Sequence, residues 1–313
     1  MNTLVTSIGS ISASFAIKTL KEMSFKVVGV DIYQKSWVAT ASEVDLFYQV
    51  PLTINSDLYL SEILSICSEN NIKIVIPLTD VDVDFYAEHI NIFKKHNLIV
   101  TISNSDVIDL VRNKLLVYQK LCTTNIKVIP TYTKDDYEGF CNKTPIVAKK
   151  VNGRSSQGLR IINNIEEFRK MDFAEDYIFQ PLIKGDIIVV DVLSDIDKDI
   201  VVQVTRKELT RTSNGAGIAV EIIENNSLKD RVIELCKILN IKGCANFEFI
   251  NTGDEFFLMD INPRPSAGVV FSNYAGYNFI KNHVNIFIEE SIDDYEGAKE
   301  GLIITRKFIE VIN

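Results

Sequence analysis

The sequence has few cysteines, and their arrangement suits neither metal binding nor disulfide formation. Five occur among 313 residues, an odd number, and none belongs to a CxxC pair. This pattern argues against a zinc site and a disulfide framework and fits reduced thiols in a cytosolic protein. A catalytic cysteine is the minor alternative. The five are Cys67, Cys122, Cys141, Cys236 and Cys244.

Positive charge, histidine and long apolar runs are also scarce. The net charge is −9, so no general basic field attracts phosphate backbones, and nucleic acid and anionic membranes are not expected partners. No apolar run approaches about 18 residues and no charged segment precedes the first apolar residues, so neither a membrane span nor a signal peptide is expected. A soluble cytoplasmic protein follows. His89, His96 and His283 are scattered, which favours structural or surface roles.

The first third of the chain alternates short strands with helical patterns. Its apolar runs are brief and rich in β-branched residues, and the intervening stretches place apolar residues at i, i+3 and i+4. This βαβ series predicts a parallel, Rossmann-like sheet in an α/β (α+β) protein. The predicted strands are 4–8, 26–32, 46–51, 73–78 and 98–103.

A dinucleotide site in this sheet is only weakly supported. The first strand runs into SIGSISAS, which has one glycine where the dinucleotide fingerprint requires GxGxxG. Asp31 ends the second strand, where an acid would bind the ribose of NAD, but capping of the next element is the preferred interpretation. An NAD-dependent dehydrogenase is therefore the weaker alternative.

The middle of the chain contains a helical pattern followed by a glycine loop between two strands. NSDVIDLVRNKLLVYQKLC predicts one helix with Asn104 or Ser105 as its N-cap, and Lys114 lies among its apolar residues. In PIVAKKVNGRSSQGLRII, a strand ends at Lys149 and Lys150, and the loop offers backbone N–H groups that suit phosphate oxygens. An ordinary antiparallel hairpin is the alternative. The loop residues of interest are Gly153, Ser155, Ser156 and Gly158.

Acidic and basic residues gather near the end of a predicted strand pair. FEFI and EFFLMDINP read as strands joined by the turn NTGD. Residues i and i+2 of a strand share a face, so Asp260 and Asn262 point the same way, and Glu248 can join them from the neighbouring strand. Such hard oxygen ligands suit magnesium held together with phosphates, and Arg264 suits phosphate or carboxylate. A solvated edge strand with a salt bridge is the alternative.

Taken together, these segments resemble the ATP-grasp superfamily. DINPRPSAG is similar to its E-[IVM]-N-P-R-x-[SG] signature, ANFEF to the preceding strand, PIVAKKVNGRSSQG to its lysine and flexible loop, and FQPLIKGD to its hinge. The order agrees, and the branch with most similarity is the carbamoyl-phosphate-synthase-like one. The resemblance implies an ATP-grasp fold with an N-terminal Rossmann-like pre-ATP-grasp domain over 1–110, a small lid subdomain over 111–180 and a C-terminal subdomain with the metal site over 181–313.

The resemblance also implies roles for individual residues. Glu248, Asp260 and Asn262 match the magnesium ligands, and Lys149 and Lys114 match basic contacts of ATP. Further matches are Gln180 at the adenine amino group, Leu182 as a backbone contact nearby, and Arg264 facing the transferred phosphoryl group.

Two positions depart from the superfamily pattern. Asp260 stands where glutamate is usual, and its shorter arm is expected still to coordinate the ion but to shift its position. Ile187 stands at the position of a ribose-binding glutamate, so either the adjacent Asp186 substitutes or the ribose is held less tightly.

The implied function is an ATP-dependent carboxylate–amine or carboxylate–thiol ligase. A small-molecule acid would form an acyl phosphate, an amine would capture it, and ADP and phosphate would be released with ATP and Mg²⁺ as cofactors. Arg206, Arg211 and Arg264 are the candidates for gripping the carboxylate and the acyl phosphate, with a solvated basic turn as the alternative for the first two. A homodimer is envisaged. A non-catalytic ATP-binding protein is the main alternative function.

Overall fold

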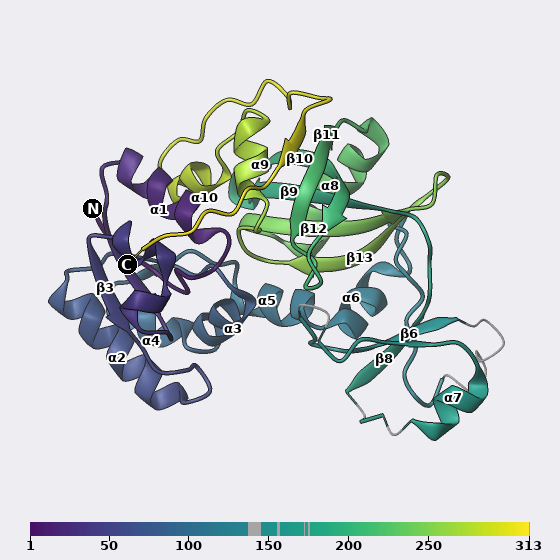
Figure 1. Cartoon of the computed structure of the whole chain (residues 1–313). Coiled ribbons are helices and arrows are strands. Elements are labelled where there is room, and N and C mark those ends of the chain that lie inside the picture. Colours follow the sequence, from purple (N-terminus) through teal and green to yellow (C-terminus); the bar gives the residue numbers. More distant parts are fainter. Residues whose placement is uncertain (137–144, 155–156, 172, 175, 313) are drawn as a thin grey trace.

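The computed structural model describes residues 1–136, 145–154, 157–171, 173–174 and 176–312. Ser155 and Ser156 lie outside the described residues. Three sheets organise the described chain, here called the N-terminal, small and large sheets (Figure 1). In this view the N-terminal sheet lies at the left, the large sheet at the upper centre and the small sheet at the lower right.

The N-terminal sheet is parallel throughout, which confirms the Rossmann-like prediction. Its strand order is β3-β2-β1-β4-β5. The strands are β1 Asn2–Val5, β2 Lys26–Asp31, β3 Leu46–Gln49, β4 Ile74–Ile76 and β5 Ile99–Val100. The helices are α1 Ala13–Glu22, α2 Ser56–Glu69, α3 Asp80–Glu88 and α4 Ile90–Lys95, with 3₁₀ turns at Lys35–Trp37 and Ala39–Ser42.

The strand order of this sheet reverses between β1 and β4. In open α/β sheets, ligands bind beyond the carboxyl ends of the strands at such a reversal. The loop after β1 is shaped by Ser7, whose φ is 48°, and Asp31 accepts hydrogen bonds from Gly9 N at 2.8 Å and Tyr33 N at 3.1 Å. Asp31 therefore holds the backbone of two loops, but it does not cap the next element, because the 3₁₀ turn Lys35–Trp37 has Gln34 as its N-cap, so the capping interpretation was wrong.

The helix expected after residue 104 is interrupted, so the prediction of one continuous helix is wrong. Two helices are present, α5 Ser105–Arg112 and α6 Lys114–Leu121, with Asn113 extended between them. The Asn113 side chain accepts hydrogen bonds from Leu115 N and Leu116 N, so it caps α6. Asparagine competes with the helical backbone in this way, and the break places Lys114 in the first turn of a new helix.

The small sheet is antiparallel and follows the order β7-β6-β8. Its strands are β6 Ile146–Lys150, β7 Arg160–Ile162 and β8 Tyr177–Pro181, and α7 Ile165–Lys170 accompanies them. In its core, Phe168 stacks on Phe173, and the Phe179 ring meets both of them edge to face. The glycine loop thus joins two antiparallel strands, as predicted.

The large sheet has six antiparallel strands in the order β13-β12-β9-β10-β11-β14. The strands are β9 Asp186–Asp195, β10 Ile200–Arg211, β11 Gly217–Ile223, β12 Gly243–Asn251, β13 Phe256–Asn262 and β14 Ile303–Thr305. The helices that follow or separate them are α8 Asn226–Leu239, α9 Val269–Tyr274 and α10 Phe279–Phe287, with a 3₁₀ turn at Ile196–Lys198.

The two faces of the large sheet differ in polarity. On one face, Phe247 and Val190 pack with Leu235 of α8 in an apolar core. On the other face, Leu193 and Cys244 pack against the N-terminal part of the molecule at one end of the strands. Toward the other end, that second face carries the charged side chains described below.

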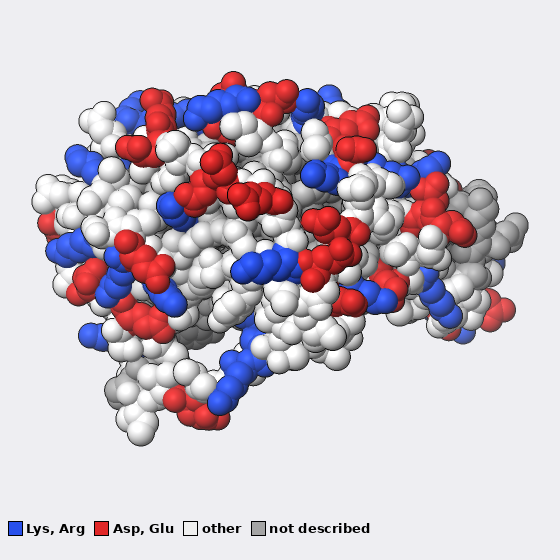
Figure 2. All heavy atoms as spheres, turned by 90° about the horizontal axis from the view of Figure 1, so that it is seen from above, with Lys and Arg blue, Asp and Glu red and all other residues white. Residues whose placement is uncertain are grey.

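Surface charge is mixed on the face shown in Figure 2, where Lys and Arg side chains are interspersed with Asp and Glu. Among the residues that the structure describes, no helix has both the length and the apolar character needed to cross a bilayer.

Candidate active site

A cavity of about 430 Å³ gathers side chains from the small and large sheets and from α6. It also receives the loops after β1 and β4, Gly9 to Ser12 and Leu78 to Asp80. Many of the residues singled out in the sequence line it: Lys114, Lys149, Gly153, Arg206, Arg211, Glu248, Asp260, Asn262 and Arg264.

The candidate metal ligands lie on one face of the β12–β13 pair. Glu248 is directly opposite Asp260 in the strand register, and Asn262 is opposite Asn246. Alternation then brings Glu248, Asp260 and Asn262 to the same side, as the sequence predicted. Although β13 is an edge strand, the Glu248 and Asp260 side chains are only 16% and 28% exposed, so the solvated-edge alternative does not describe them.

Both carboxylates are paired with cations. Lys114 Nζ lies 3.2 Å from Asp260 Oδ1, and Arg211 Nη2 lies 2.8 Å from Glu248 Oε2. Burial raises the pKa of Glu248, and Arg211 opposes that rise.

The donor set fits a hard divalent cation that shares its coordination with phosphates. It consists of two carboxylates and the Asn262 amide, whose nitrogen donates to Asn246 Oδ1 at 3.4 Å and so leaves its oxygen for another partner. Within the described ranges, no three His, Cys, Asp or Glu side chains form a self-sufficient metal cage. Magnesium is commonly held in this way, by one or two carboxylates plus substrate oxygens.

Two lysines approach the carboxylates from the small sheet and α6. Lys114 Nζ donates a hydrogen bond to Gly153 O at 2.8 Å, which ties α6 to the glycine loop. The pKa of Lys149 is lowered to about 8, mainly by burial and also by Lys114, while Asp260 and Glu248 oppose the shift. Lys150 also borders the cavity, but its ammonium pairs with Asp176 at 3.2 Å.

The predicted adenine contacts lie beside the large cavity. Gln180 lines a smaller cavity of about 20 Å³ that shares Lys114 and Asp260 with the larger one. Gln180 Nε2 donates to Thr131 Oγ1 at 2.8 Å. The Leu182 amide already donates to Pro145 O at 3.0 Å, because pairing of β6 with β8 continues to that point, so this N–H is occupied.

Asp186 and Gly158 do not reach the cavity. Asp186 pairs with Lys207 at 2.7 Å on the face of the large sheet opposite Arg206, because side chains alternate along β9 and β10. Substitution of Asp186 for the ribose-binding glutamate is therefore not seen. Gly158 has a φ of 71° and packs next to the Tyr177 hydroxyl.

Arg206 is a buried strand residue, which overturns the solvated-turn alternative for it. Its side chain is 4% exposed. It lies 2.6 Å from Asp191 through Nη1 and 3.0 Å from Glu208 through Nε. Arg211, at the end of the same strand, is part-buried and pairs with Glu248. Both arginines are thus held by carboxylates at the cavity wall.

Arg264 is oriented by the N-terminal part of the chain. After Asn262 the backbone turns, with Arg264 N donating to Asn262 O at 2.9 Å, so simple strand alternation does not continue. The guanidinium binds Asp80 in a bidentate manner, with Nε–Oδ1 at 3.0 Å and Nη2–Oδ2 at 3.1 Å. Burial raises the pKa of Asp80, but Arg264 and Arg112 outweigh it, and the net shift is downward.

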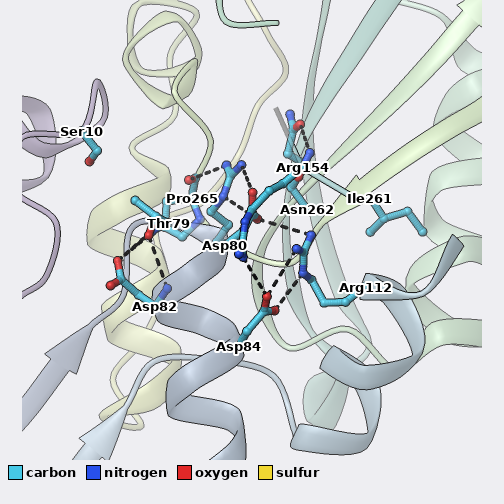
Figure 3. A network of polar contacts seen from close by, with 12 residues as sticks. Ser10, Thr79, Asp80, Asp82, Asp84, Arg112, Arg154, Ile261, Asn262 and Pro265 are labelled. Atoms are coloured by element: carbon cyan, nitrogen blue, oxygen red, sulfur yellow. Dashed lines mark hydrogen bonds and ion pairs between the residues drawn. The ribbon is translucent and has the colours of Figure 1, made fainter. Parts of the chain in front are cut away.

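The Asp80 pair belongs to a network that joins four parts of the chain (Figure 3). Arg112 of α5 donates from Nε to Asp84 Oδ1 at 2.8 Å. Arg154 of the glycine loop donates from Nη1 to Asp84 Oδ2 at 3.1 Å. Helix α3 therefore carries two carboxylates that hold α5, the glycine loop and the turn after β13 around the cavity.

The sequence interpretation missed the N-terminal contribution. Ser10, Ser12, Thr79 and Asp80 line the cavity from the loops after β1 and β4. Thr79 and Asp82 form a capping box at the start of α3. Their spacing in the sequence could have predicted a helix start that places Asp80 in its first turn. The sequence did not reveal that β1 and β4 are adjacent strands, and this adjacency brings the two loops together at the cavity.

Comparison with known proteins supports the arrangement. A family model described as an ATP-grasp domain matches residues 111–268, and a PylC-like N-terminal domain model matches residues 3–101. The carbamoyl phosphate synthase large chain of Agathobacter rectalis is 24% identical over 198 residues, covering 58% of this chain and 18% of that protein. That of Clostridium acetobutylicum is 26% identical over 121 residues, covering 36% and 11%. The chain thus spans less than a fifth of these relatives.

Solved structures share the fold. The biotin carboxylase of Campylobacter jejuni, crystallised as a β,γ-ATP complex, superimposes with a TM-score of 0.80 at 17% identity, covering 96% of this chain and 73% of that one. N5-carboxyaminoimidazole synthetase of Staphylococcus aureus, complexed with ADP, gives a TM-score of 0.75 at 14% identity and covers 93% and 78%. With the ATP-grasp model matching half of its length, this chain belongs to the ATP-grasp family.

Proposed function

We propose that this protein is an ATP-dependent carboxylate–amine ligase that acts on small molecules. The observation that carries the proposal is the row formed by Glu248, Asp260 and Asn262, which faces Lys149 and Lys114 in one cavity. Acidic ligands facing lysines across a cavity suit a nucleotide whose phosphates are held with a divalent cation. Family membership and the ATP and ADP complexes named among the similar structures support this proposal.

The chain supplies positioning and charge for phosphoryl transfer. Magnesium bound at Glu248, Asp260 and Asn262 would neutralise phosphate charge. Lys149 and the backbone around Gly153 bind the phosphates, and the adenine lies toward Gln180, where the small cavity of about 20 Å³ must widen to receive it. The neighbouring loop positions Ser155 and Ser156 stay predictions. Phosphoryl transfer depends mainly on such positioning and electrostatic stabilisation.

The proposed reaction has two steps. A substrate carboxylate oxygen attacks the γ-phosphorus of ATP, forming an acyl phosphate and releasing ADP. An amine then attacks the acyl carbon, its C–N bond replaces the C–O bond to phosphate, and one phosphate and the protons of the ammonium are released. Arg264, held in place by Asp80, lies where it can bind the anionic acid or acyl phosphate.

Magnesium-dependent ADP release tests the proposal. The protein is incubated with ATP, Mg²⁺ and pools of small carboxylic acids, amino acids and amines, and ADP is measured. We expect release that requires both the pool and Mg²⁺, and loss of release in Asp260→Ala. Asp254→Ala is the matched control, because Asp254 is exposed in the turn between the same two strands. No ADP release with any pool, or undiminished release by folded Asp260→Ala, contradicts the proposal.

A further inference from the structure

Glu208 of β10 brings a buried carboxylate oxygen without a partner to the cavity wall. The side chain is 2% exposed and lines the cavity. Its Oε1 accepts a hydrogen bond from Arg206 Nε at 3.0 Å, whereas its Oε2 has no hydrogen-bond partner among the described residues. Burial of a carboxylate oxygen without a hydrogen-bond donor lowers the stability of the fold, so such an oxygen usually has a partner.

Arg206, which already contacts Glu208, cannot turn to supply that donor. Arg206 is fixed on Asp191 through Nη1 at 2.6 Å. Asp191 is itself saturated, because Ser266 Oγ donates to it at 2.7 Å, Ser272 Oγ at 2.6 Å and Asn246 Nδ2 at 3.0 Å. The guanidinium is therefore locked in one orientation, and it reaches Glu208 through Nε alone.

A glycine at position 217 leaves room for the Glu208 side chain. A Cβ at Gly217, on the adjacent strand β11, would collide with Glu208 Oε2. Gly217 itself lines the cavity, as do the residues Asn214 to Ala216 before it. The absence of a side chain at position 217 thus leaves room for the carboxylate oxygen at the cavity wall.

A second unpartnered group of opposite polarity lies three residues further along β10. Arg211 Nε is buried, lines the cavity and has no partner within the described part of the chain. The pairing of β10 with β11 shifts register between Glu208 and Arg211, and this irregularity turns Arg211 to the cavity side, which strict alternation would not do. A buried hydrogen-bond acceptor and a buried donor thus lie on two side chains that line the same cavity.

We propose that Glu208 Oε2 binds the amino group of the ligase's amine substrate, and that this substrate also carries an anionic group, which Arg211 Nε receives. The assignment rests on the proposed function and deepens it. A lone carboxylate oxygen repels ATP phosphates and attracts an ammonium group, and the candidate metal ligands lie on β12 and β13, with β9 between them and β10. The substrate class is therefore small amino acids, with an amine and a carboxylate a few bonds apart.

Binding of small probes tests this assignment. Wild-type protein with Mg²⁺ and a non-hydrolysable ATP analogue is titrated by calorimetry with glycine, β-alanine and 4-aminobutyrate, and with acetate, propionate and butyrate as amine-free counterparts. We expect at least one amino acid to bind and its counterpart to bind at least tenfold more weakly. In Glu208→Gln, the amide oxygen faces Arg206 and the NH₂ group faces the ligand amine, so amino-acid binding weakens at least tenfold.

Two controls keep the result interpretable. Glu221→Gln makes the same charge change on β11, outside the cavity lining, and should bind the probes as the wild type does. Should Glu208→Gln fail to fold, Glu208→Asp withdraws the oxygen but keeps the charge and should show the same weakening. Binding of no amino acid by the wild type, or equal binding by the folded Glu208 variant, overturns the assignment. Analogue binding is a separate readout, and its absence in the wild type would contradict the proposed function.

Discussion

Lys149 and Lys150 are neighbours on β6 that carry the same charge into different surroundings. Lys149 faces the acidic row of the large sheet, and burial lowers its pKa to about 8. Lys150 pairs with the half-exposed Asp176 and lies over the Tyr177 ring. Strand alternation accounts for this difference, and the sequence predicted it.

Replacement of each lysine by alanine should separate their roles. Lys149→Ala removes a charge-assisted phosphate contact worth roughly 1.5–3 kcal/mol, so affinity for a non-hydrolysable ATP analogue with Mg²⁺ should fall about tenfold or more. Lys150→Ala should change it only slightly. Calorimetric titration measures both. A larger loss in Lys150→Ala would mean that the wrong lysine faces the nucleotide.

The lowered pKa of Lys149 predicts how nucleotide binding depends on pH. Below pH 8 the ammonium is already charged in the free protein. Above pH 8 it is mostly neutral, so binding to phosphate must take up a proton, and affinity should weaken by up to about tenfold per pH unit. Titrations at pH 9 in two buffers of different ionisation enthalpy should reveal this uptake, and Lys149→Met should not show it. Equal proton uptake in the two proteins would exclude Lys149 as its source.

At the scale of elements, the break between α5 and α6 positions Lys114. Asn113 caps α6, and Lys114 in the first turn reaches both Asp260 and Gly153. Asn113→Ala removes the cap and should destabilise the protein by about 1 kcal/mol. It should also weaken binding of the ATP analogue, because Lys114 loses its fixed position. Chemical denaturation and calorimetry check the two effects, whereas Asn113→Asp, which can still cap, should restore stability. Unchanged stability in Asn113→Ala would contradict the capping role.

The sequence predicted those elements whose pattern is local. The β12–β13 pair and the Glu248, Asp260 and Asn262 face follow from alternation and a turn, and the parallel N-terminal sheet follows from its βαβ series. The break at Asn113 was missed because the apolar pattern continues across it. The bulge that re-aims Arg211 was missed because register shifts depend on the partner strand.

At the scale of the whole molecule, contacts between residues far apart in the sequence complete the site. Local sequence patterns could not predict these contacts. The Asp80–Arg264 pair joins residues 184 positions apart, so only the folded chain shows it. His283 makes a second such link, with Cys244 N donating to its Nδ1 at 2.8 Å and its Nε2 lying 3.1 Å from Thr101 O. This confirms the structural role expected for His283.

The predicted domain boundaries at residues 110 and 180 stay a prediction.

The His283 link makes stability depend on pH. Burial lowers the pKa of His283 to about 4, whereas the unfolded chain titrates near 6.5. Its contribution is fully present above pH 6.5 and is lost as the pH falls toward 4, because only the unfolded chain takes up the proton. The loss between pH 7 and 4.5 should be roughly 2–3 kcal/mol. Urea denaturation at both pH values should show a smaller loss in His283→Gln, and an equal loss would contradict this origin.

The central claim, that ATP activates a substrate carboxylate at this cavity, is tested most directly by following oxygen. The protein is supplied with ATP, Mg²⁺, unlabelled amines and a pool of acids whose carboxylates carry ¹⁸O, and the phosphate released is analysed by mass spectrometry. Attack by the carboxylate on the γ-phosphorus leaves its oxygen on phosphate when the amine displaces it, so we predict one ¹⁸O per phosphate released during ligation. Release of ADP with unlabelled phosphate would show that water, and not a carboxylate, receives the phosphoryl group, and would contradict the account.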